Sequence, residues 1–498
     1  MKNIKNIIAA LVLLLVAASS LINCKKDNST TPVTPVKVVI KDTSIVNRFI
    51  YGGLKDYYLW TDQVPTLANT KYSNKDTLNV LLNSYKDPQQ FFTSLLYQYN
   101  TVDKWSFLVN DSATITNWIQ GISQTMGYDF MLARIGTAGD LFGFVRYVYK
   151  GGPAEKAGIK RGDLFMKVNG TQLNISNYQT LLFTNITYTL SMATITGTKI
   201  SLNGNTVTTT AITMQENPIL LDTVLNVNNL KIGYLVYNGF NSDFDIQLND
   251  VFKKFKTAAI DKLILDLRYN GGGSVQTAKY LASMIYGTAT TSVFFKSEYN
   301  QLLQNYITSV NGASSLSENF TDRILKTSTN PETPINSLNL TSLYVITSGN
   351  TASASELLIN GLKPYMQVFS VGTSTVGKYV ASWTIKDWID NNGTVNPKDP
   401  YAMQPIVVKI ANANGVTDFT SGLAPDFVAQ EDIANLIPFG DPTETLLRPV
   451  LNKIQGLPLS SISLKSEKLG LKKVTDSQLE RPFGRDMHIN SLPKLTRN

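Results

Sequence analysis

The spacing of hydrophobic and polar positions changes along the chain and divides it into segments with different predicted structures. Between residues 41 and 115, aromatic and aliphatic side chains recur at helical spacing, which predicts a small helical domain. Residues 116–216 form short alternating runs between glycine-containing turns, the pattern of a β-rich domain. Residues 217–456 alternate apolar runs with helical patterns, which is the order of elements in an α/β core. The pattern therefore predicts a multidomain α/β protein.

The two ends of the chain depart from this pattern. Residues 1–24 carry two lysines, then an apolar run over 7–22, and end at a cysteine, as in an export signal that is short for a membrane span. Residues 25–40 are polar and contain prolines, which is typical of a flexible tether. Residues 457–498 are mildly basic and weakly periodic. We expect this C-terminal extension to be partly disordered and assign it no function.

Within the α/β segment, an apolar run at 343–346 is followed by small residues at 347–351 and then by a helical pattern, which predicts strand, tight turn and helix. Ser353 stands where this helix begins, beside unpaired N–H groups and the positive end of the helix dipole, which favour negative charge nearby. With Glu356 three residues later, the same serine also matches a capping box that merely satisfies the helix start. The local pattern therefore leaves Ser353 either a nucleophile or a capping residue.

Composition narrows the chemistry open to Ser353. The chain has one histidine, His488, far along the polar C-terminal extension, and one cysteine, Cys24, inside the export signal. A Ser-His-Asp triad and a cysteine nucleophile are therefore both disfavoured. Lys378 follows Ser353 by 25 residues, in a glycine-bounded loop among apolar residues that would bury it. Because burial favours the neutral form that a lysine needs as a base, a Ser-Lys pair is the expected alternative.

A buried strand over residues 262–268 precedes Tyr269, Asn270 and three glycines. Such a turn lets the backbone approach a ligand closely and point N–H groups at an oxyanion. An ordinary turn between a strand and a helix has the same composition, so this motif alone is not specific. Two other stretches of the core carry simpler expectations: residues 287–340 form a polar, irregular insertion, and residues 441–454 form an amphipathic helix.

Three motifs together resemble one family, the carboxyl-terminal processing or tail-specific proteases. They are TASASE at 351–356, GTSTVGK at 372–378 and DLRYNGGG at 266–273. The resemblance implies an α/β protease core of the ClpP/crotonase-like type. It also implies a serine endopeptidase that cleaves protein substrates through a Ser-Lys dyad.

The resemblance assigns a role to each matching residue. It implies Ser353 as the nucleophile, Lys378 as the base, and backbone N–H groups of Gly272 and Ala354 as the oxyanion hole. Many members carry a glutamine four residues after the lysine to orient it, and Ser382 stands at that position here. By this position, Ser382 is the expected orienting residue. Because a serine reaches less far than a glutamine, the identity of a third catalytic residue stays open.

Residues 152–163, GPAEKAGIKRGD, combine a Gly-Pro turn, a short helix and a second glycine turn ahead of a strand. This segment resembles a PDZ domain, a module that captures peptide ends by adding them as a strand. The resemblance implies peptide binding at the loop of Gly127, Tyr128, Asp129 and Phe130. Asp129 would repel a carboxylate that it faced. Recognition of free C-termini is therefore not clearly expected.

Residues 21–24 resemble the lipobox of bacterial lipoproteins, in which the cysteine is lipidated. This implies that Cys24 anchors an exported protein to a membrane, facing the periplasm or the cell exterior. The net charge of +8 comes without basic runs and interleaved aromatics, so nucleic acid is not an expected partner. Expected partners are protein or peptide substrates, with no metal or organic cofactor implied and the oligomeric state open. The alternative function is a catalytically silent peptide-binding lipoprotein of the same fold.

Overall fold

The computed structural model describes residues 43–327, 331–390, 393–460, 463–481 and 484–493. The export signal, the tether and Cys24 lie outside the described residues, so their assignments stay predictions. Within the described ranges, no helix combines the length and the apolar character needed to cross a bilayer.

The first described segment is helical, as the sequence predicts. Its elements are α2 (Thr43–Tyr57), η1 (Thr61–Gln63), α3 (Pro65–Ala68), η2 (Thr70–Ser73), α4 (Lys75–Ser84) and α5 (Pro88–Ser94). Val46, Ile50 and Leu54 lie one turn apart on α2 and are fully buried, so the apolar stripe forms the core of this domain. Asp87 caps α5 by accepting a hydrogen bond from Gln89 N at 2.9 Å.

A short segment then leads out of the helical domain, through β1 (Phe107–Val109) and α6 (Ser112–Ile119). Asp103 fixes its start, because its carboxylate accepts hydrogen bonds from Trp105 N at 3.0 Å and Ser106 N at 2.9 Å. The same carboxylate accepts a hydrogen bond from Tyr58 Oη at 2.7 Å. The carboxylate therefore locks the junction onto the helical domain.

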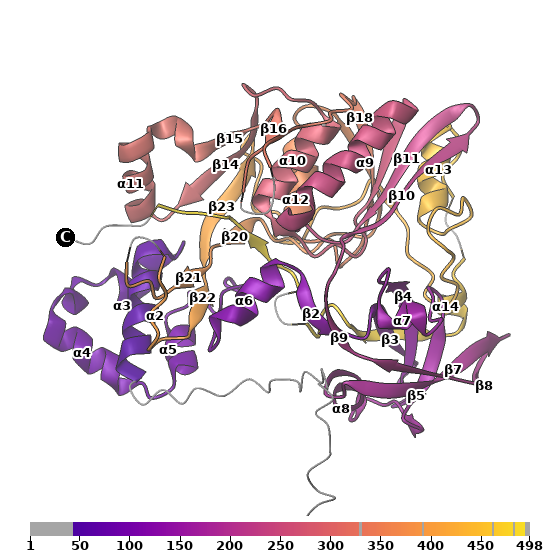
Figure 1. Cartoon of the computed structure of the whole chain (residues 1–498), viewed down its shortest axis with the longest axis horizontal. Coiled ribbons are helices and arrows are strands. Elements are labelled where there is room, and N and C mark those ends of the chain that lie inside the picture. Colours follow the sequence, from indigo (N-terminus) through magenta and orange to yellow (C-terminus); the bar gives the residue numbers. More distant parts are fainter. Residues whose placement is uncertain (1–42, 328–330, 391–392, 461–462, 482–483, 494–498) are drawn as a thin grey trace, which may run out of the picture. The chain divides into compact units, whose positions relative to one another are not determined.

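The next domain is rich in strands, again as predicted. Its elements are β2 (Ile122–Thr125), β3 (Tyr128–Ile135), β4 (Phe142–Val148), α7 (Pro153–Lys156), β5 (Leu164–Val168), β6 (Thr171–Gln172), α8 (Tyr178–Phe183), β7 (Thr187–Thr196), β8 (Lys199–Thr210) and β9 (Ile212–Gln215). The main sheet has the order β25-β3-β4-β5-β7-β8 (Figure 1). Its outermost strand on the β3 side, β25 (Leu471–Asp476), comes from the C-terminal extension.

The α/β core is built on a six-stranded sheet of order β10-β11-β12-β18-β19-β24. These strands are β10 (Ile219–Val227), β11 (Leu230–Tyr237), β12 (Lys262–Asp266), β18 (Ser342–Thr347), β19 (Gln367–Gly372) and β24 (Phe427–Val428). All neighbours are parallel except β10 and β11. The helices are η3 (Ser242–Phe244), α9 (Asp245–Ala258), α10 (Val275–Ile285), α12 (Ala354–Leu362) and α13 (Leu447–Ile454).

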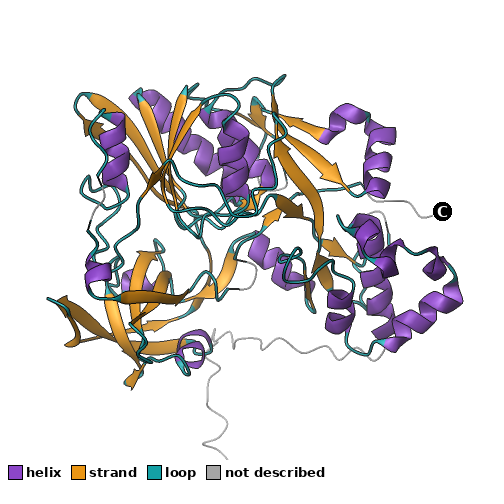
Figure 2. Cartoon of the chain, turned by 180° about the vertical axis from the view of Figure 1, so that it is seen from behind, coloured by secondary structure: helices purple, strands orange, loops and turns teal. Residues whose placement is uncertain are grey.

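Alternating residues of β11 face opposite sides of this sheet. Ile232, Tyr234 and Val236 pack against α13, whereas Gly233 lies against Phe255 of α9. Helices α9, α10 and α12 lie together in Figures 1 and 2, and α10 contacts both of the others. The parallel strands are thus covered on both faces, which is the layered architecture expected of an α/β core.

A second six-stranded sheet has the order β13-β26-β20-β23-β14-β15, and all its strands except β26 belong to the core segment. Its strands are β13 (Gly273–Ser274), β14 (Val293–Tyr299), β15 (Ser317–Asn319), β20 (Val380–Ser382), β23 (Ile406–Asn412) and β26 (Met487–His488). The remaining elements are α11 (Gln301–Asn311), η4 (Ala313–Leu316), β16 (Arg323–Ile324), β17 (Thr333–Pro334), β21 (Ile385–Lys386), β22 (Ala402–Gln404) and α14 (Lys465–Lys468).

The predictions for two stretches of the core are wrong in detail. Residues 287–340 are not an irregular insertion, because β14 pairs with β23 over five residues and α11 follows it. The predicted helix at 441–454 begins only at Leu447. The Glu444 side chain accepts hydrogen bonds from Leu446 N and Leu447 N, so it satisfies the N–H groups of the first turn and sets the start of α13.

The prediction that the C-terminal extension is partly disordered is also wrong for its described residues. They form α14, β25 and β26, and β26 lies inside the second sheet between β13 and β20. His488 is therefore not in an outlying polar tail, since only 5% of it is exposed. Strand pairing with distant partners supplies the order that local periodicity did not indicate.

Candidate active site

Ser353 occupies the turn between β18 and α12, as the strand, turn and helix pattern predicts. It is fully buried and its φ is +63°, a backbone conformation that side chains with a Cβ adopt at an energetic cost. Ser353 Oγ has no hydrogen-bond partner among the described residues. Ser353 and Glu356 have the arrangement of a capping box, in which Ser353 Oγ faces Glu356 N, but the serine hydroxyl forms no hydrogen bond within the described ranges. The strained conformation of Ser353 is a feature that capping alone does not explain.

Glu356 does more than complete a capping box. Its carboxylate accepts hydrogen bonds from Ser353 N at 2.7 Å, Gly377 N at 2.6 Å and Lys378 N at 2.9 Å. Thr375 Oγ1 donates a further hydrogen bond to it at 2.5 Å. Burial raises the pKa of Glu356, and these four hydrogen bonds oppose that effect. The carboxylate therefore fixes the serine turn and the lysine loop to each other.

Lys378 lies in the loop between β19 and β20 and is 1% exposed, so the predicted burial is confirmed. Its ammonium Nζ donates hydrogen bonds to Asp486 Oδ1 at 2.5 Å and to Arg485 O at 3.2 Å. It also lies 4.9 Å from the centre of the Trp105 ring. Within the described residues, no hydrogen bond joins Lys378 Nζ to Ser353 Oγ. The two residues share one buried region, but the lysine is held by the C-terminal extension.

Ser382, the expected orienting residue, contacts Asp486 and not Lys378. Its hydroxyl lies 2.8 Å from Asp486 Oδ2 and accepts a hydrogen bond from Gln404 Nε2 at 2.9 Å. Gln404 is fully buried. A chain of contacts therefore runs from Gln404 through Ser382 and Asp486 to Lys378. Sequence reasoning missed Asp486 and Gln404, since neither is close to the lysine along the chain.

The glycine turn lies directly against the serine. A Cβ on Gly272, whose φ is +112°, would stand 2.5 Å from Ser353 Cβ, so only glycine fits there. Gly272 N donates to Asn270 Oδ1 at 2.9 Å, whereas Gly273 N donates to the backbone carbonyl of Asp486 at 2.7 Å. The assignment of Gly272 and Ala354 as oxyanion donors stays a prediction. The carbonyl that accepts the hydrogen bond of Gly273 N thus belongs to the chain's own extension.

His488 enters the same region from the extension. Its ring lies 5.8 Å from that of Trp118, and its Nδ1 lacks a hydrogen-bond partner among the described residues. Burial lowers the pKa of the His488 imidazole, while Asp486 raises it and Lys378 lowers it. The sequence-based expectation that this histidine lies far from the site is wrong, because β26 carries it there.

A cavity of about 510 Å³ lies beside the glycine turn. The residues that line it include Trp118, Gly271, Gly272, Gly273, Arg481, Asp486 and His488. In the described part of the chain, neither Ser353 nor Lys378 lines this cavity. Residues of the extension therefore form part of the cavity wall, while the predicted nucleophile and base are buried and do not line the cavity.

The loop predicted to bind peptides contacts other parts of the chain. Gly127 has φ of +82° and Tyr128 Oη is 2.7 Å from Tyr188 Oη. Asp129 is buried and forms a bidentate ion pair with Arg146, so its charge is compensated. Phe130 exchanges hydrogen bonds with Ser477 of the extension: Ser477 N donates to Phe130 O at 2.9 Å, and Phe130 N donates to Ser477 Oγ at 3.1 Å. The role of these four residues in binding substrate stays a prediction.

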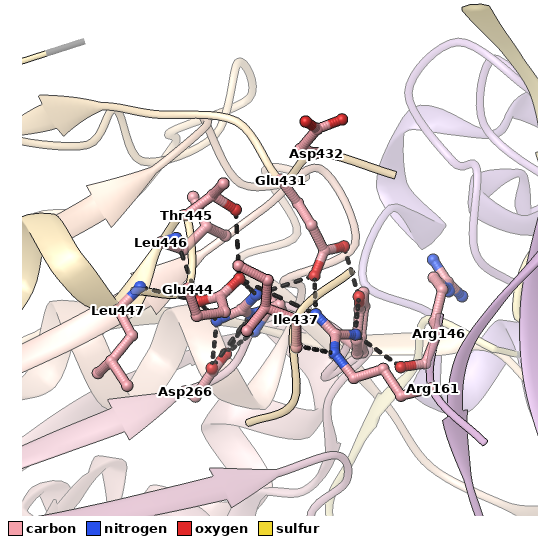
Figure 3. Close-up of polar contacts among 12 residues, drawn as sticks. Arg146, Arg161, Asp266, Glu431, Asp432, Ile437, Glu444, Thr445, Leu446 and Leu447 are labelled. Carbon is pink, nitrogen blue, oxygen red and sulfur yellow. Dashed lines mark hydrogen bonds and ion pairs between the residues drawn. The ribbon is translucent and has the colours of Figure 1, made fainter. Parts of the chain in front are cut away.

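A buried charge network connects the β-rich domain to the glycine turn (Figure 3). Arg161, from the turn after α7, pairs with Glu431 at 2.7 Å and donates to Tyr269 Oη at 3.1 Å. Arg268 pairs with the same Glu431 at 2.8 Å and with Glu444 at 2.7 Å. Arg268 and Tyr269 immediately precede the glycine turn, so this network fixes the turn to the neighbouring domain.

Comparisons with known proteins agree with this architecture. Three family profiles match the chain: "Peptidase S41 N-terminal domain" at residues 46–107, "PDZ domain" at 144–183 and "Peptidase family S41" at 231–418. Each match falls within one of the three domains expected from the sequence, at 41–115, 116–216 and 217–456. The chain therefore contains a PDZ domain between a helical domain and an S41 peptidase core.

Individual relatives are distant. The chain is 23% identical to a "Probable CtpA-like serine protease" of Staphylococcus aureus over 47% of its own length and 41% of the relative's. It is 25% identical to the chloroplastic C-terminal processing peptidase of Tetradesmus obliquus, over 49% of each chain. The matches thus span less than half of these curated relatives.

A solved structure gives a more complete match. A candidate S41 protease from Bacteroides fragilis NCTC 9343 superposes with a TM-score of 0.63 and 25% identity, covering 82% of this chain and 97% of that one. The fold and the domain order agree with the profile matches, and the chain belongs to peptidase family S41.

Proposed function

We propose that this chain is a serine endopeptidase in which Ser353 is the nucleophile and Lys378 the general base. One observation carries the proposal: a fully buried serine at a helix start, in a strained conformation and with a hydroxyl that has no partner among the described residues. The helix start and the adjacent glycine turn supply N–H groups near the carbon that Ser353 would attack. The same residues match the motifs of the protease family.

The chemistry follows from these positions. Neutral Lys378 takes the proton of Ser353 Oγ as the hydroxyl attacks the carbonyl carbon of the scissile peptide bond. Backbone N–H groups of the glycine turn and of Ala354 stabilise the negative oxygen of the tetrahedral intermediate. The protonated lysine then gives its proton to the leaving amine, and water hydrolyses the acyl-enzyme by the same steps. Lys378 Nζ donates to Asp486 Oδ1 and Arg485 O, so these contacts have to be broken before it can reach the hydroxyl of Ser353.

Labelling with a fluorophosphonate probe tests the assignment. Ser353→Ala should abolish labelling and peptide cleavage, whereas Ser355→Ala, a rival serine two residues later, should keep the label. Lys378→Arg should also lose labelling, because a guanidinium stays protonated and cannot act as a base. Wild-type labelling in Ser353→Ala would refute the nucleophile. If neither the wild type nor any variant is labelled, while the wild type still binds peptides, the protein would be a catalytically silent peptide-binding protein.

We further propose that the protein is exported and lipid-anchored at Cys24, facing the periplasm or the cell exterior. Support comes from the apolar run over residues 7–22, the lipobox-like residues 21–24 and the polar tether that follows. One lipidated residue would provide the hydrophobic attachment. Its substrates are then proteins or peptides of the cell envelope.

A further inference from the structure

The C-terminal extension occupies the edge of the PDZ sheet on which peptide ligands of such domains bind. Strand β25 pairs antiparallel with β3, with Leu471 opposite Ile135 and Asp476 opposite Met131. Val474 packs against the hydrophobic core of the PDZ domain. We call residues 471–477 the groove segment. It has the extended form and strand pairing of a ligand added to a sheet edge, with one partly buried aliphatic side chain against the domain core.

The groove segment continues past the loop at Gly127 to Phe130 instead of ending there. Ser477 bonds Phe130 through both backbone and side chain, and its hydroxyl donates to Asp129 Oδ2 at 2.7 Å. Glu480 then accepts a hydrogen bond from Tyr178 Oη of α8 at 3.2 Å. Both sides of the groove, β3 and α8, are therefore engaged by one continuous described stretch of the extension.

The extension reaches the catalytic region at residues 484–489, which we call the cleft segment. Its strand β26 pairs parallel with β13 through Met487 and His488, and with β20 through His488 and Ser382. Gly273 N donates to Asp486 O at 2.7 Å, and Ile489 N donates to Ser382 O at 3.0 Å. The cleft segment therefore fills the space between the glycine turn and the strand that follows the lysine loop.

The fit of the cleft segment is close. A Cβ on Gly271 would stand 2.1 Å from Gly484 O, and one on Gly272 would stand 2.6 Å from Asp486 O. The glycine turn thus accepts the passing backbone only because it has no side chains. Because residues of this segment line the cavity beside the turn and Ser353 does not, a peptide in the cavity cannot reach the serine while the segment is in place.

The cleft segment also holds the predicted base. Asp486 Oδ1 lies 2.5 Å from Lys378 Nζ, and both side chains are nearly fully buried. Asp486 Oδ1 and Arg485 O accept the hydrogen bonds of Lys378 Nζ, and among the described residues no hydrogen bond joins Nζ to Ser353 Oγ. In this arrangement the extension therefore both covers the nucleophile and holds the base away from it.

We propose that the C-terminal extension is an internal ligand, whose groove segment fills the PDZ groove while its cleft segment fills the catalytic cleft. An extended substrate peptide with an aliphatic side chain at the position of Val474 would bind by displacing it. Displacement frees Lys378 from Asp486, so occupation of the PDZ groove by another peptide favours an open cleft. The catalytic half of this inference rests on the proposed peptidase, whereas the PDZ half does not.

A binding experiment on the full chain tests the groove segment without any need for activity. The probe is a fluorescein-labelled peptide of residues 471–481, measured by anisotropy. Val474→Asp puts a charge against the apolar core and should release the groove segment. A tethered segment competes at an effective concentration on the order of millimolar. If the segment binds the groove with a Kd of about 0.1 mM, its release should tighten binding of the probe by about tenfold. Lys468→Ala, an exposed site upstream, should bind as wild type. Equal affinity in Val474→Asp and wild type would overturn the groove assignment.

A labelling experiment tests the cleft segment. Asp486→Asn keeps the shape of the side chain but removes its charge, so it weakens the charge-assisted hydrogen bond that holds Lys378 Nζ to the cleft segment and should raise the rate of fluorophosphonate labelling of Ser353 by about tenfold. An unchanged rate would overturn the inference. A reduced rate would mean that Asp486 positions Lys378 productively, which also overturns it. Since Asp486→Asn leaves Val474 in place, it still tests the idea if Val474→Asp fails to fold.

The two experiments separate the failure of each proposal. Tighter binding of the peptide to Val474→Asp, with no labelling in any variant, would retain the internal ligand in the PDZ groove and refute the peptidase. If the wild type is labelled and neither substitution increases the labelling rate, the peptidase proposal stands and the internal-ligand proposal is refuted. The thermal midpoint of each variant, measured by circular dichroism, shows whether the chain has folded.

Discussion

Replacing Arg268 with methionine should destabilise the chain strongly, because its guanidinium compensates three carboxylates in a buried network. Arg268 is 1% exposed and pairs with Asp266 at 2.7 Å, Glu444 at 2.7 Å and Glu431 at 2.8 Å. Asp266 and Glu444 are as buried as the arginine. Methionine would fill much of the volume, so the main effect of the substitution is electrostatic.

The magnitude follows from the buried charges that would remain. Removing one partner of a buried ion pair costs about 3–5 kcal/mol, since the other charge is left without compensation. Glu431 would keep Arg161 at 2.7 Å, whereas Asp266 and Glu444 would lose their closest cation. We therefore expect the free energy of unfolding to fall by about 3–5 kcal/mol at neutral pH.

The pH dependence gives this prediction a distinctive signature. Burial raises the pKa of Glu431, but Arg161 and Arg268 outweigh burial and lower it to about 2. A carboxylate with a lowered pKa in the folded state stabilises the wild type above its unfolded pKa, and this contribution is lost as the pH falls towards 2. In Arg268→Met, the carboxylates that have lost Arg268 take up protons as the pH falls. Protonation removes their uncompensated charge and so reduces the destabilisation of the variant. The gap between the two proteins should therefore narrow as the pH falls.

Urea denaturation followed by circular dichroism measures this gap. Arg323→Met is the matched control, because Arg323 pairs with Asp322 and Glu332 but is half-exposed, and its loss should leave the unfolding midpoint nearly unchanged. Adding Glu444→Gln to Arg268→Met should recover part of the loss. A decrease below about 1 kcal/mol, the typical effect of an ordinary substitution, would refute the reasoning. A gap that is independent of pH would refute its electrostatic origin.

Three other perturbations test separate parts of the molecule. Burial raises the pKa of Asp245 to about 7 while Thr277 lowers it, so this acid destabilises the fold progressively from about pH 4 to 7. Asp245→Asn should therefore raise the thermal midpoint at pH 8 and leave it little changed at pH 4, with an equal shift at both values contradicting the cause. Cys24→Ala should move the protein from the membrane fraction to the soluble fraction, and unchanged fractionation would remove the anchor. In the full-length protein with the groove segment released, Arg146 loses Asp476 but keeps its bidentate pair with Asp129. Because Asp129 still compensates this guanidinium, free and C-terminally amidated peptides should bind the PDZ domain with similar affinity; binding that disappears on amidation would refute this.

Much of the fold was accessible from the sequence because it rests on local patterns. The apolar run, small turn and helical stripe around Ser353 predicted β18, the turn and α12, and all three are confirmed. Glycines mark the places where two backbones touch, so the turn at Gly272 could also be found from sequence. The burial of Lys378 followed from its apolar neighbours. The spacing of these motifs fixed which residues face one another, but not their protonation or their partners.

The partners of the lysine could not be predicted, because they come from distant parts of the chain. Asp486 is 108 positions from Lys378, and Gln404 contacts Ser382 across 22. The extension has weak local periodicity, and its strands are fixed by pairing with edges that belong to other domains. His488 was set aside for the same reason. A short strand that pairs with a sheet of another domain has only a weak pattern in its own sequence.

The strand edges also explain why an internal ligand suits this protein. A groove that binds extended peptides must present unpaired N–H and C=O groups, and such an edge attracts any other extended chain. Here β3 is bordered by β4 on one side and by the extension on the other, and β20 is bordered by β23 and again by the extension. The chain therefore covers both open edges with its own residues. A substrate needs the same hydrogen bonds as the groove and cleft segments, so it competes with the extension for these edges. On the proposed internal-ligand model, the affinity of a peptide for β3 therefore determines how often Lys378 is freed from Asp486.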